Sequence, residues 1–282
     1  MDQFGKLPDF VKQTHDKGAA ITANHPWYSY GLFSNKSKAP GGYTDDYDNI
    51  EINSCSDNTE NLQTLNSAVK LWTAYVTGEK DNFYGEVKKP HYLVGGSDTH
   101  DVLYYGFADD KYKNTKRSST DYVSGKVRTF AFVGETANND ITENGLAYAE
   151  AVVNGASFTS FGPILDPSEI PGQEYTTTNG TFDLTVDISS LAKIKDVIVL
   201  SSTAKDKYDN ATFRDLPYEA GYSVKGINKN EYKLELKFQV APGKSNWVSI
   251  LVVDENDSYA ISNPYWVKGV ETESPDNEKP EL

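Results

Sequence analysis

The chain has 282 residues, with 41 acidic and 27 basic side chains, which gives a formal net charge of −14 at neutral pH. This excess of carboxylates disfavours binding to nucleic acids or anionic membranes, because neutralising phosphates requires clustered cations. The single cysteine excludes an intrachain disulfide framework and a cysteine-rich zinc module.

Length and composition also predict the organisation and location of the protein. A chain of this length is expected to form two domains. No apolar run approaches the roughly 18 residues of a membrane helix, and the first segment lacks the apolar stretch of a signal peptide. One Cys and one Met beside 19 Tyr favour an extracytoplasmic or secreted bacterial protein. The acidic, Pro-containing residues 271–282 are expected to be a polar linker or disordered tail.

The first part of the chain alternates helices and strands. A short helix is expected over 9–17, before an apolar strand at 19–23. Asp57 and Glu60 have the spacing of a capping box, and they open a helix whose apolar residues recur every three or four positions until Gly78. Such alternation is typical of a β/α domain, in which helices cover a sheet.

The last helix of this part is expected at 141–154. Its inward-facing residues are predicted to be Leu146, Ala149, Val152 and Val153. We expect the β/α domain to cover residues 1–165.

After this point the hydrophobic period changes to two. Apolar and polar residues alternate over 182–188 and 232–240. Further strands are expected at 194–201, 247–253 and 260–267. Several strands without an intervening helix predict a β-sandwich over residues 166–270. The fold class is therefore α/β followed by all-β.

The segment with the most chemical information is Leu93 to His100, an apolar strand that runs into Asp98-Thr99-His100. In extended backbone, residues i and i+2 point to the same side, so an extended Asp98-Thr99-His100 segment can direct both Asp98 and His100 towards one cavity. Carboxylate and imidazole are groups through which proteins bind Zn, Mn or Fe. A second apolar strand, at 19–23, leads into Asn24-His25-Pro26.

Four segments, taken in order, resemble the C-terminal part of a PHP-domain metal-dependent hydrolase. They read GAAITANHPW from residue 18, NIEINS from residue 49, LWTAYVTGE followed by HYLVGGSDTH up to His100, and GLAYAEAVVNGASFTSFGPIL from residue 145. The closest branch is the CehA/McbA-like one, whose members are described as phosphoesterases. The resemblance covers roughly the first 165 residues, and the order of the segments is more specific than any single one.

The resemblance implies part of a distorted β/α barrel that holds two or three divalent metal ions, Zn, Mn or Fe, at the C-terminal ends of its strands. His25 matches the histidine of the family's HP motif, and Asp98 and His100 match its late D-x-H motif. All three are expected to be metal ligands, distributed over different metals.

The chain also departs from the family pattern. PHP domains begin with an H-x-H strand and a D-H turn, and nothing before Phe4 offers these residues. A catalytic zinc ion normally takes about three protein ligands. We therefore expect an N-terminally truncated part of a larger polypeptide, a remnant that has lost its site, or a protein whose missing half another chain supplies. By itself this chain is expected to complete no full metal cluster and to be inactive, and one alternative is that it binds no metal.

Three polar residues are candidates for the surroundings of the site. Glu51 alternates with apolar neighbours in Ile50-Glu51-Ile52-Asn53, and it is interpreted as a group that hydrogen-bonds a ligand, with direct ligation and a rim position as alternatives. Asn24 and Asn53 are expected to orient ligands or substrate. His15 is expected to face solvent, and the resemblance gives His91 no role.

The resemblance implies hydrolysis of a small phosphate ester, or of a carboxylic or carbamate ester, by a metal-bound water. The alternative is a non-catalytic surface module that binds a glycan or a partner protein through the Tyr- and Gly-rich segment from Trp27 to Tyr47. A glycosidase is a third hypothesis, but its paired carboxylates cannot be assigned from sequence.

Overall fold

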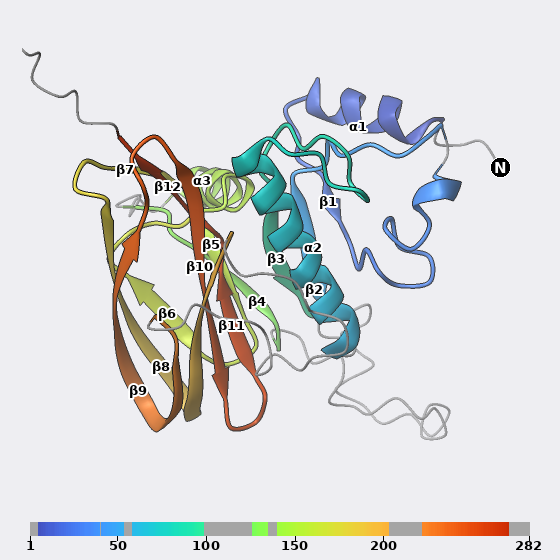
Figure 1. The fold of residues 1–282 in the computed structure, drawn as a ribbon. Helices are drawn as coiled ribbons and strands as arrows, with labels where there is room; N and C mark the ends of the chain where they lie inside the picture. The colour runs from blue at the N-terminus through green and yellow to red at the C-terminus, as the bar shows by residue number, and fades with distance from the viewer. Residues whose placement is uncertain are drawn as a thin grey trace, which may run out of the picture.

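The computed structural model describes residues 5–39, 41–53, 58–98, 126–134, 140–202 and 222–270. The predictions for Asp57, His100 and the tail 271–282 lie outside these ranges. The described part is mostly β, and its strands form a three-stranded parallel sheet and a nine-stranded sheet (Figure 1).

The parallel sheet carries the residues of interest. Its strands are β1 (Thr22–Ala23), β2 (Asn49–Asn53) and β3 (Tyr92–Gly96), in the order β1-β2-β3. Helix α1 (Leu7–His15) precedes β1, and the 3-10 helix η1 (Lys36–Lys38) lies between β1 and β2. Within the described ranges this sheet is open, so the distorted barrel remains a prediction.

Helix α2 (Asn58–Thr77) connects β2 to β3 and ends before Gly78, which adopts a φ of 69°. Its apolar spacing is confirmed, since Leu65 and Trp72 are fully buried. The helix packs between the two sheets, and the rings of Trp72 and Trp247 lie 5.2 Å apart. No helix in the described ranges is long and apolar enough to cross a membrane.

The large sheet is built mainly from the second half of the chain. Its strands are β4 (Arg128–Ala131), β5 (Ser157–Ser160), β6 (Ile164–Pro167), β7 (Glu174–Thr177), β8 (Thr181–Ser201), β9 (Val224–Gln239), β10 (Ser245–Asp254), β11 (Tyr259–Ser262) and β12 (Tyr265–Gly269). Helix α3 (Ile141–Val153) lies between β4 and β5 in sequence. Because β4 and β5 join this sheet, strands from both sides of residue 165 share it.

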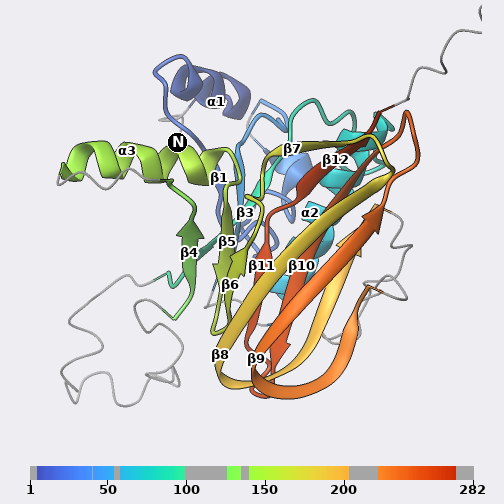
Figure 2. The same cartoon turned by 90° about the vertical axis from the view of Figure 1, so that its left-hand side faces the viewer.

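The sheet curls because β8 is long enough to belong to two parts of it (Figure 2). Residues 181–189 pair with β9, and 194–201 pair with β10. The pairing shifts register between Ser189 and Ile194, and such a bulge bends a strand. The alternating residues of 182–188 and the equivalent residues of β9 face one enclosed core, as predicted. The prediction of an all-β, sandwich-like part is therefore confirmed as a curled sheet that encloses a core.

Strand β10 is buried on both faces, which explains its uninterrupted apolar sequence. Val248, Ile250 and Val252 face the core inside the curled sheet. Trp247 and Leu251 point the other way, into the core shared with α2 and the parallel sheet. The strand therefore joins the two cores of the protein.

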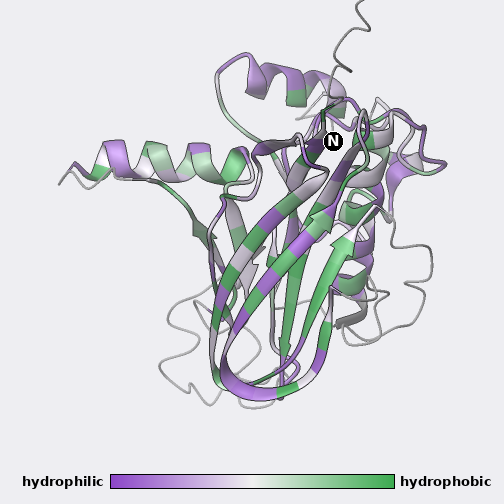
Figure 3. Cartoon of the chain, turned by 60° about the vertical axis from the view of Figure 1, so that its left-hand side comes forward, coloured by the Kyte–Doolittle hydropathy of each residue, from purple (hydrophilic) through white to green (hydrophobic). Residues whose placement is uncertain are grey.

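Helix α3 projects from the body beyond β4, with apolar residues along its length (Figures 2 and 3). Leu146 is 60% exposed and Ala149 is also exposed, so the prediction that they face inward is wrong. Val152 and Val153 are partly buried, and Ala151 is buried. Only the C-terminal end of the helix reaches the sheet, so an apolar spacing alone did not identify a buried face.

Candidate metal site at the carboxyl ends of the parallel strands

The candidate site lies where the three parallel strands end. His25 follows β1 by two residues, Glu51 lies within β2, and Asp98 follows β3 by two residues. Because β2 lies between β1 and β3, the three residues come from adjacent strands at one edge. Ligands of open α/β sheets bind outside this edge.

Glu51 contacts His25 through both its ring and its backbone. The Oε2 atom of Glu51 lies 3.0 Å from Nδ1 of His25 and accepts a hydrogen bond from the His25 backbone N–H at 3.1 Å. The two side chains are 18% and 12% exposed. A carboxylate in this position favours the tautomer with a proton on Nδ1, so that Nε2 carries the ring lone pair.

Both His25 and Asp98 have left-handed backbone conformations. Their φ angles are 31° and 48°, and the other described non-glycine residues with positive φ are Asn228 and Asp257. Asn, Asp and His enter this region more often than other non-glycine residues, although it is uncommon even for them. The conformation of Asp98 also corrects the extended backbone that was expected for Asp98-Thr99-His100. Backbone strain at a strand end is frequent where a side chain is aimed at a functional site.

The two glycines before Asp98 allow close packing around β3. A Cβ atom on Gly96 would lie 2.9 Å from Oε1 of Glu51, and one on Gly95 would lie 2.3 Å from Cγ2 of Thr159. The Gly95 N–H donates to Oγ1 of Thr129 at 2.8 Å, and the same hydroxyl donates to the Gly95 carbonyl at 3.0 Å. The glycines thus let the strand approach Glu51 on one side and the large sheet on the other.

A buried asparagine fixes β3 to the large sheet. The side chain of Asn263, 1% exposed, accepts a hydrogen bond from the Leu93 N–H at 2.7 Å and donates to the Leu93 carbonyl at 3.1 Å. It also donates to Oγ of Ser157 at 3.0 Å. The amide therefore makes the two backbone hydrogen bonds at Leu93 that a neighbouring strand would otherwise make. These bonds fix the position of β3, which leads to Asp98.

The structure says less about the other residues predicted for the site. Asn24 is exposed and precedes His25 in the chain. Asn53 is the last residue of β2, but the structure does not describe its side chain. His100 is also outside the described residues. Within the described ranges, no three His, Cys, Asp or Glu side chains gather as a metal would require. The donor types of His25 and Asp98 fit a divalent cation, but these residues alone do not complete its shell.

The opposite edge of the parallel sheet holds a charge network that sequence reasoning missed. Asp48 accepts hydrogen bonds from the Ile21 N–H at 2.7 Å and from Lys89 at 2.9 Å, and its carboxylate lies 2.9 Å from Nε2 of His15. The expectation that His15 faces solvent is wrong, since its side chain is 25% exposed and also contacts Asp46. Burial opposes ionisation of Asp48, but these contacts outweigh it and lower its pKa.

His91 is a structural residue at the same edge. It is fully buried, its Nε2 donates to the Asp45 carbonyl at 2.7 Å, and its ring lies 4.5 Å from that of Tyr47. Burial lowers the pKa of the imidazole, which favours the neutral form. Its position immediately before a buried strand was the sequence signal for this role.

Comparison with known proteins assigns no family. No protein-family model and no curated protein matches the sequence. Solved structures with limited similarity include the sulfur carrier protein SoxY from Chlorobium limicola f thiosulfatophilum, with 12% identity over 39% of this chain and 79% of SoxY and a TM-score of 0.22. Fibronectin(III)-like modules of Clostridium thermocellum CbhA show 16% identity over 38% of this chain and 100% of theirs, with a TM-score of 0.21. Similarities at this level support no statement about function.

Proposed function

We propose that the chain is part of a metal-dependent hydrolase of the PHP type that acts on phosphate esters. The observation that carries the proposal is the contact of Glu51 with the His25 ring at the carboxyl ends of the parallel strands, where Asp98 follows the adjacent strand β3. On this proposal β1, β2 and β3 belong to the distorted β/α barrel, and the curled sheet covers it.

The metal ions would be held by His25 through Nε2, by Asp98 through its carboxylate and by His100. A bound divalent ion supplies a water of lowered pKa and offsets the charge of the phosphoryl group. Zn, Mn and Fe all accept this combination of donors. Further ligands from another part of the polypeptide complete the shells.

The chain's own residues have positioning roles. Glu51 fixes the tautomer and the direction of the His25 ring, and His25 and Asp98 both follow strand ends in left-handed backbone conformations. In hydrolysis the water oxygen bonds to phosphorus while the bond to the leaving alcohol breaks, and that alcohol takes up a proton. Asn24, exposed beside His25, is available to hydrogen-bond the substrate.

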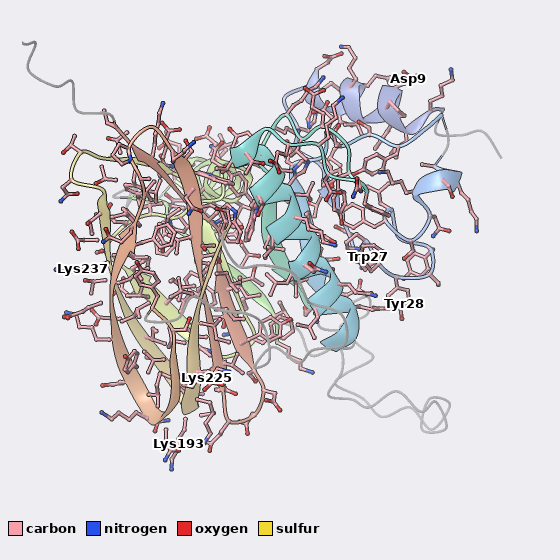
Figure 4. The ribbon with its side chains drawn as sticks, in the orientation of Figure 1. Asp9, Trp27, Tyr28, Lys193, Lys225 and Lys237 are labelled. Atoms are coloured by element: carbon pink, nitrogen blue, oxygen red, sulfur yellow. The ribbon has the colours of Figure 1, made fainter. Side chains whose placement is uncertain are left out.

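The test is hydrolysis of a panel of alkyl and aryl phosphate mono- and diesters by the purified chain supplemented with any N-terminal segment encoded with it, with Zn²⁺, Mn²⁺ or Fe²⁺ added in turn. We expect phosphate release that a chelator abolishes and that His25→Ala and Asp98→Ala remove. The matched control is Asp9→Asn, which changes an exposed carboxylate on α1 (Figure 4). Release at the rate of the His25→Ala variant with every metal, also after addition of any N-terminal segment encoded with the chain, would contradict the proposal.

A further inference from the structure

Two tyrosines lie against the ring of His25 on the loop 26–39. The ring centroids of His25 and Tyr30 are 5.7 Å apart, and those of His25 and Tyr28 are 6.1 Å apart, both in edge-to-face geometry. Tyr28 and Tyr30 are 4.9 Å from each other. Tyr30 is 68% exposed, more than the other exposed aromatic side chains in the described ranges. We refer to Tyr28 and Tyr30 as the tyrosine wall.

The loop is anchored by other side chains, so core packing does not require the tyrosine wall. The indole of Trp27, which is labelled in Figure 4, donates to Oγ of Ser67 in α2 at 2.8 Å. Phe33 is 2% exposed. Trp27 and Phe33 also contact each other, with ring centroids 5.6 Å apart. The apolar surface of the loop is therefore buried through these two residues.

A lysine fixes the far end of the loop. The ammonium of Lys36 lies 4.2 Å from the ring centroid of Tyr43 and 4.6 Å from that of Phe83. Cations are attracted to aromatic faces at such distances. The loop is thus held at both ends, which limits how far the tyrosine wall can move.

The turn that carries the tyrosine wall requires a glycine. A Cβ atom on Gly31 would lie 2.4 Å from the carbonyl oxygen of His25 and 2.5 Å from that of Pro26. The Gly31 N–H donates to the carbonyl of Tyr28 at 2.7 Å. The chain therefore folds back tightly onto His25, and this turn sets the position of Tyr30 relative to the imidazole.

Tyr30 also borders an open groove of about 440 Å³. Apolar side chains of Leu7 and Leu32 line the groove together with Lys38. This volume is large enough for a small ring. Tyr30 therefore stands between the candidate metal ligand His25 and a groove that has an apolar lining and a nearby positive charge.

We propose that the tyrosine wall determines specificity by binding an aromatic group of the ester substrate, so that the site prefers aryl to alkyl phosphate esters. The inference rests on the proposed function, because that function places the phosphoryl group next to His25. A pair of aromatic contacts is expected to give a preference of about tenfold, by the usual strength of ring–ring interactions.

Binding of two non-hydrolysable probes tests this inference. Titration calorimetry, with Zn²⁺ or Mn²⁺ present, compares phenylphosphonate with methylphosphonate on the chain and its variants. We expect phenylphosphonate to bind about tenfold more tightly to the unaltered chain. Tyr30→Ala and Tyr28→Ala should remove the preference, whereas Tyr30→Phe should retain it.

Two further variants test whether the preference depends on where Tyr28 and Tyr30 lie, and not only on their presence. Gly31→Ala keeps both tyrosines but displaces the turn, so it should also abolish the preference, with folding checked by circular dichroism. Tyr148→Ala removes a 45% exposed tyrosine from α3 and should change neither affinity.

Failure of the specificity inference and failure of the proposed function give different binding results. Equal binding of the two phosphonates would overturn the specificity inference and leave the proposed function standing. Binding of neither phosphonate nor inorganic phosphate would contradict the proposed function and the inference together. Tyrosine-dependent binding of an oligosaccharide, in that case, would instead favour a non-catalytic glycan-binding module.

Discussion

Glu51 holds His25 at two points with one carboxylate oxygen. Oε2 lies 3.0 Å from Nδ1 of the imidazole and 3.1 Å from the backbone nitrogen of the same residue. This arrangement fixes both the left-handed backbone of His25 and the direction of its ring. It is the contact that a metal-binding histidine usually makes through its second nitrogen.

Replacing Glu51 by Gln should therefore weaken metal binding without removing a ligand. We expect the affinity to fall by about 10- to 100-fold, as is usual when the partner of a metal-ligating histidine is changed. Equilibrium dialysis against Zn²⁺ or Mn²⁺ measures the effect. The control is Glu174→Gln, an exposed carboxylate on β7 of the large sheet. An unchanged affinity in Glu51→Gln would mean that Glu51 does not support a metal ligand.

The two glycines of β3 should respond differently to the same substitution. Gly96→Ala brings a methyl group to 2.9 Å from Oε1 of Glu51, so it should displace that carboxylate and lower metal affinity. Gly95→Ala brings the methyl group to 2.3 Å from Thr159, and overpacking of this kind typically costs about 1–3 kcal/mol of stability. Urea unfolding and metal dialysis on both variants distinguish the effects. Equal losses of stability with no change in metal affinity would contradict the assignment of Gly96.

Asn263→Ala should destabilise the protein and loosen β3. The change leaves the Leu93 N–H and carbonyl without their partner, and each unpaired buried polar group costs about 1–3 kcal/mol. We expect a loss of at least about 2 kcal/mol in the free energy of unfolding, together with faster amide exchange at Leu93. Asn230→Ala, which removes exposed hydrogen bonds on β9, is the control. A loss below about 1 kcal/mol would show that water replaces the amide.

The charge network at the other edge makes stability dependent on pH. Burial works against ionisation of Asp46 and Asp48, but hydrogen bonds and charges from Lys89 and His15, with the Ile21 N–H at Asp48, lower both pKa values. A carboxyl whose folded pKa lies below its unfolded value of about 3.9 stabilises the protein above that pH and loses this effect as the pH falls through the folded pKa.

Lys89→Met should raise the folded pKa of both carboxyls and move acid unfolding to a higher pH. At neutral pH we expect a loss of about 1–2 kcal/mol, from the two lost hydrogen bonds to ionised groups. Urea unfolding between pH 2 and 7 provides the measurement. Lys12→Met is the matched control, because its ion pair with Asp16 is 72% and 58% exposed and contributes little. Coincident acid transitions for the two variants would rule out the network as a source of stability.

The sequence predicted the elements whose periodicity is regular. The apolar spacing before Gly78 identified α2, and strict alternation identified the core-facing sides of β8 and β9. It did not predict that residues 182–201 form one strand, because the register shift near Leu191, which is fully exposed, interrupts the alternation. Nor did it show that α3 projects from the body, since helix periodicity does not say what covers the apolar face.

Part of the site was also accessible from sequence. Strand-end positions placed His25 and Asp98 at one edge, and alternation suggested that Glu51 contacts a ligand residue. The hydrogen bonds of Asn263 to Leu93 were not predictable, because the two residues are 170 positions apart in the chain. The tyrosine wall lay in a segment already singled out as a candidate surface, but its contact with His25 depends on a tight turn at Gly31.

The most direct test of the metal site is elemental analysis of the purified chain, compared with an Asp98→Ala, His100→Ala double variant and with His25→Ala. The account predicts Zn, Mn or Fe bound after dialysis against excess metal, in amounts above those of both variants and with unchanged circular dichroism, although His25, Asp98 and His100 alone do not complete a metal shell. Metal content at the level of the double variant, even after dialysis against excess Zn²⁺ or Mn²⁺, would contradict the central claim that this edge of the sheet binds metal.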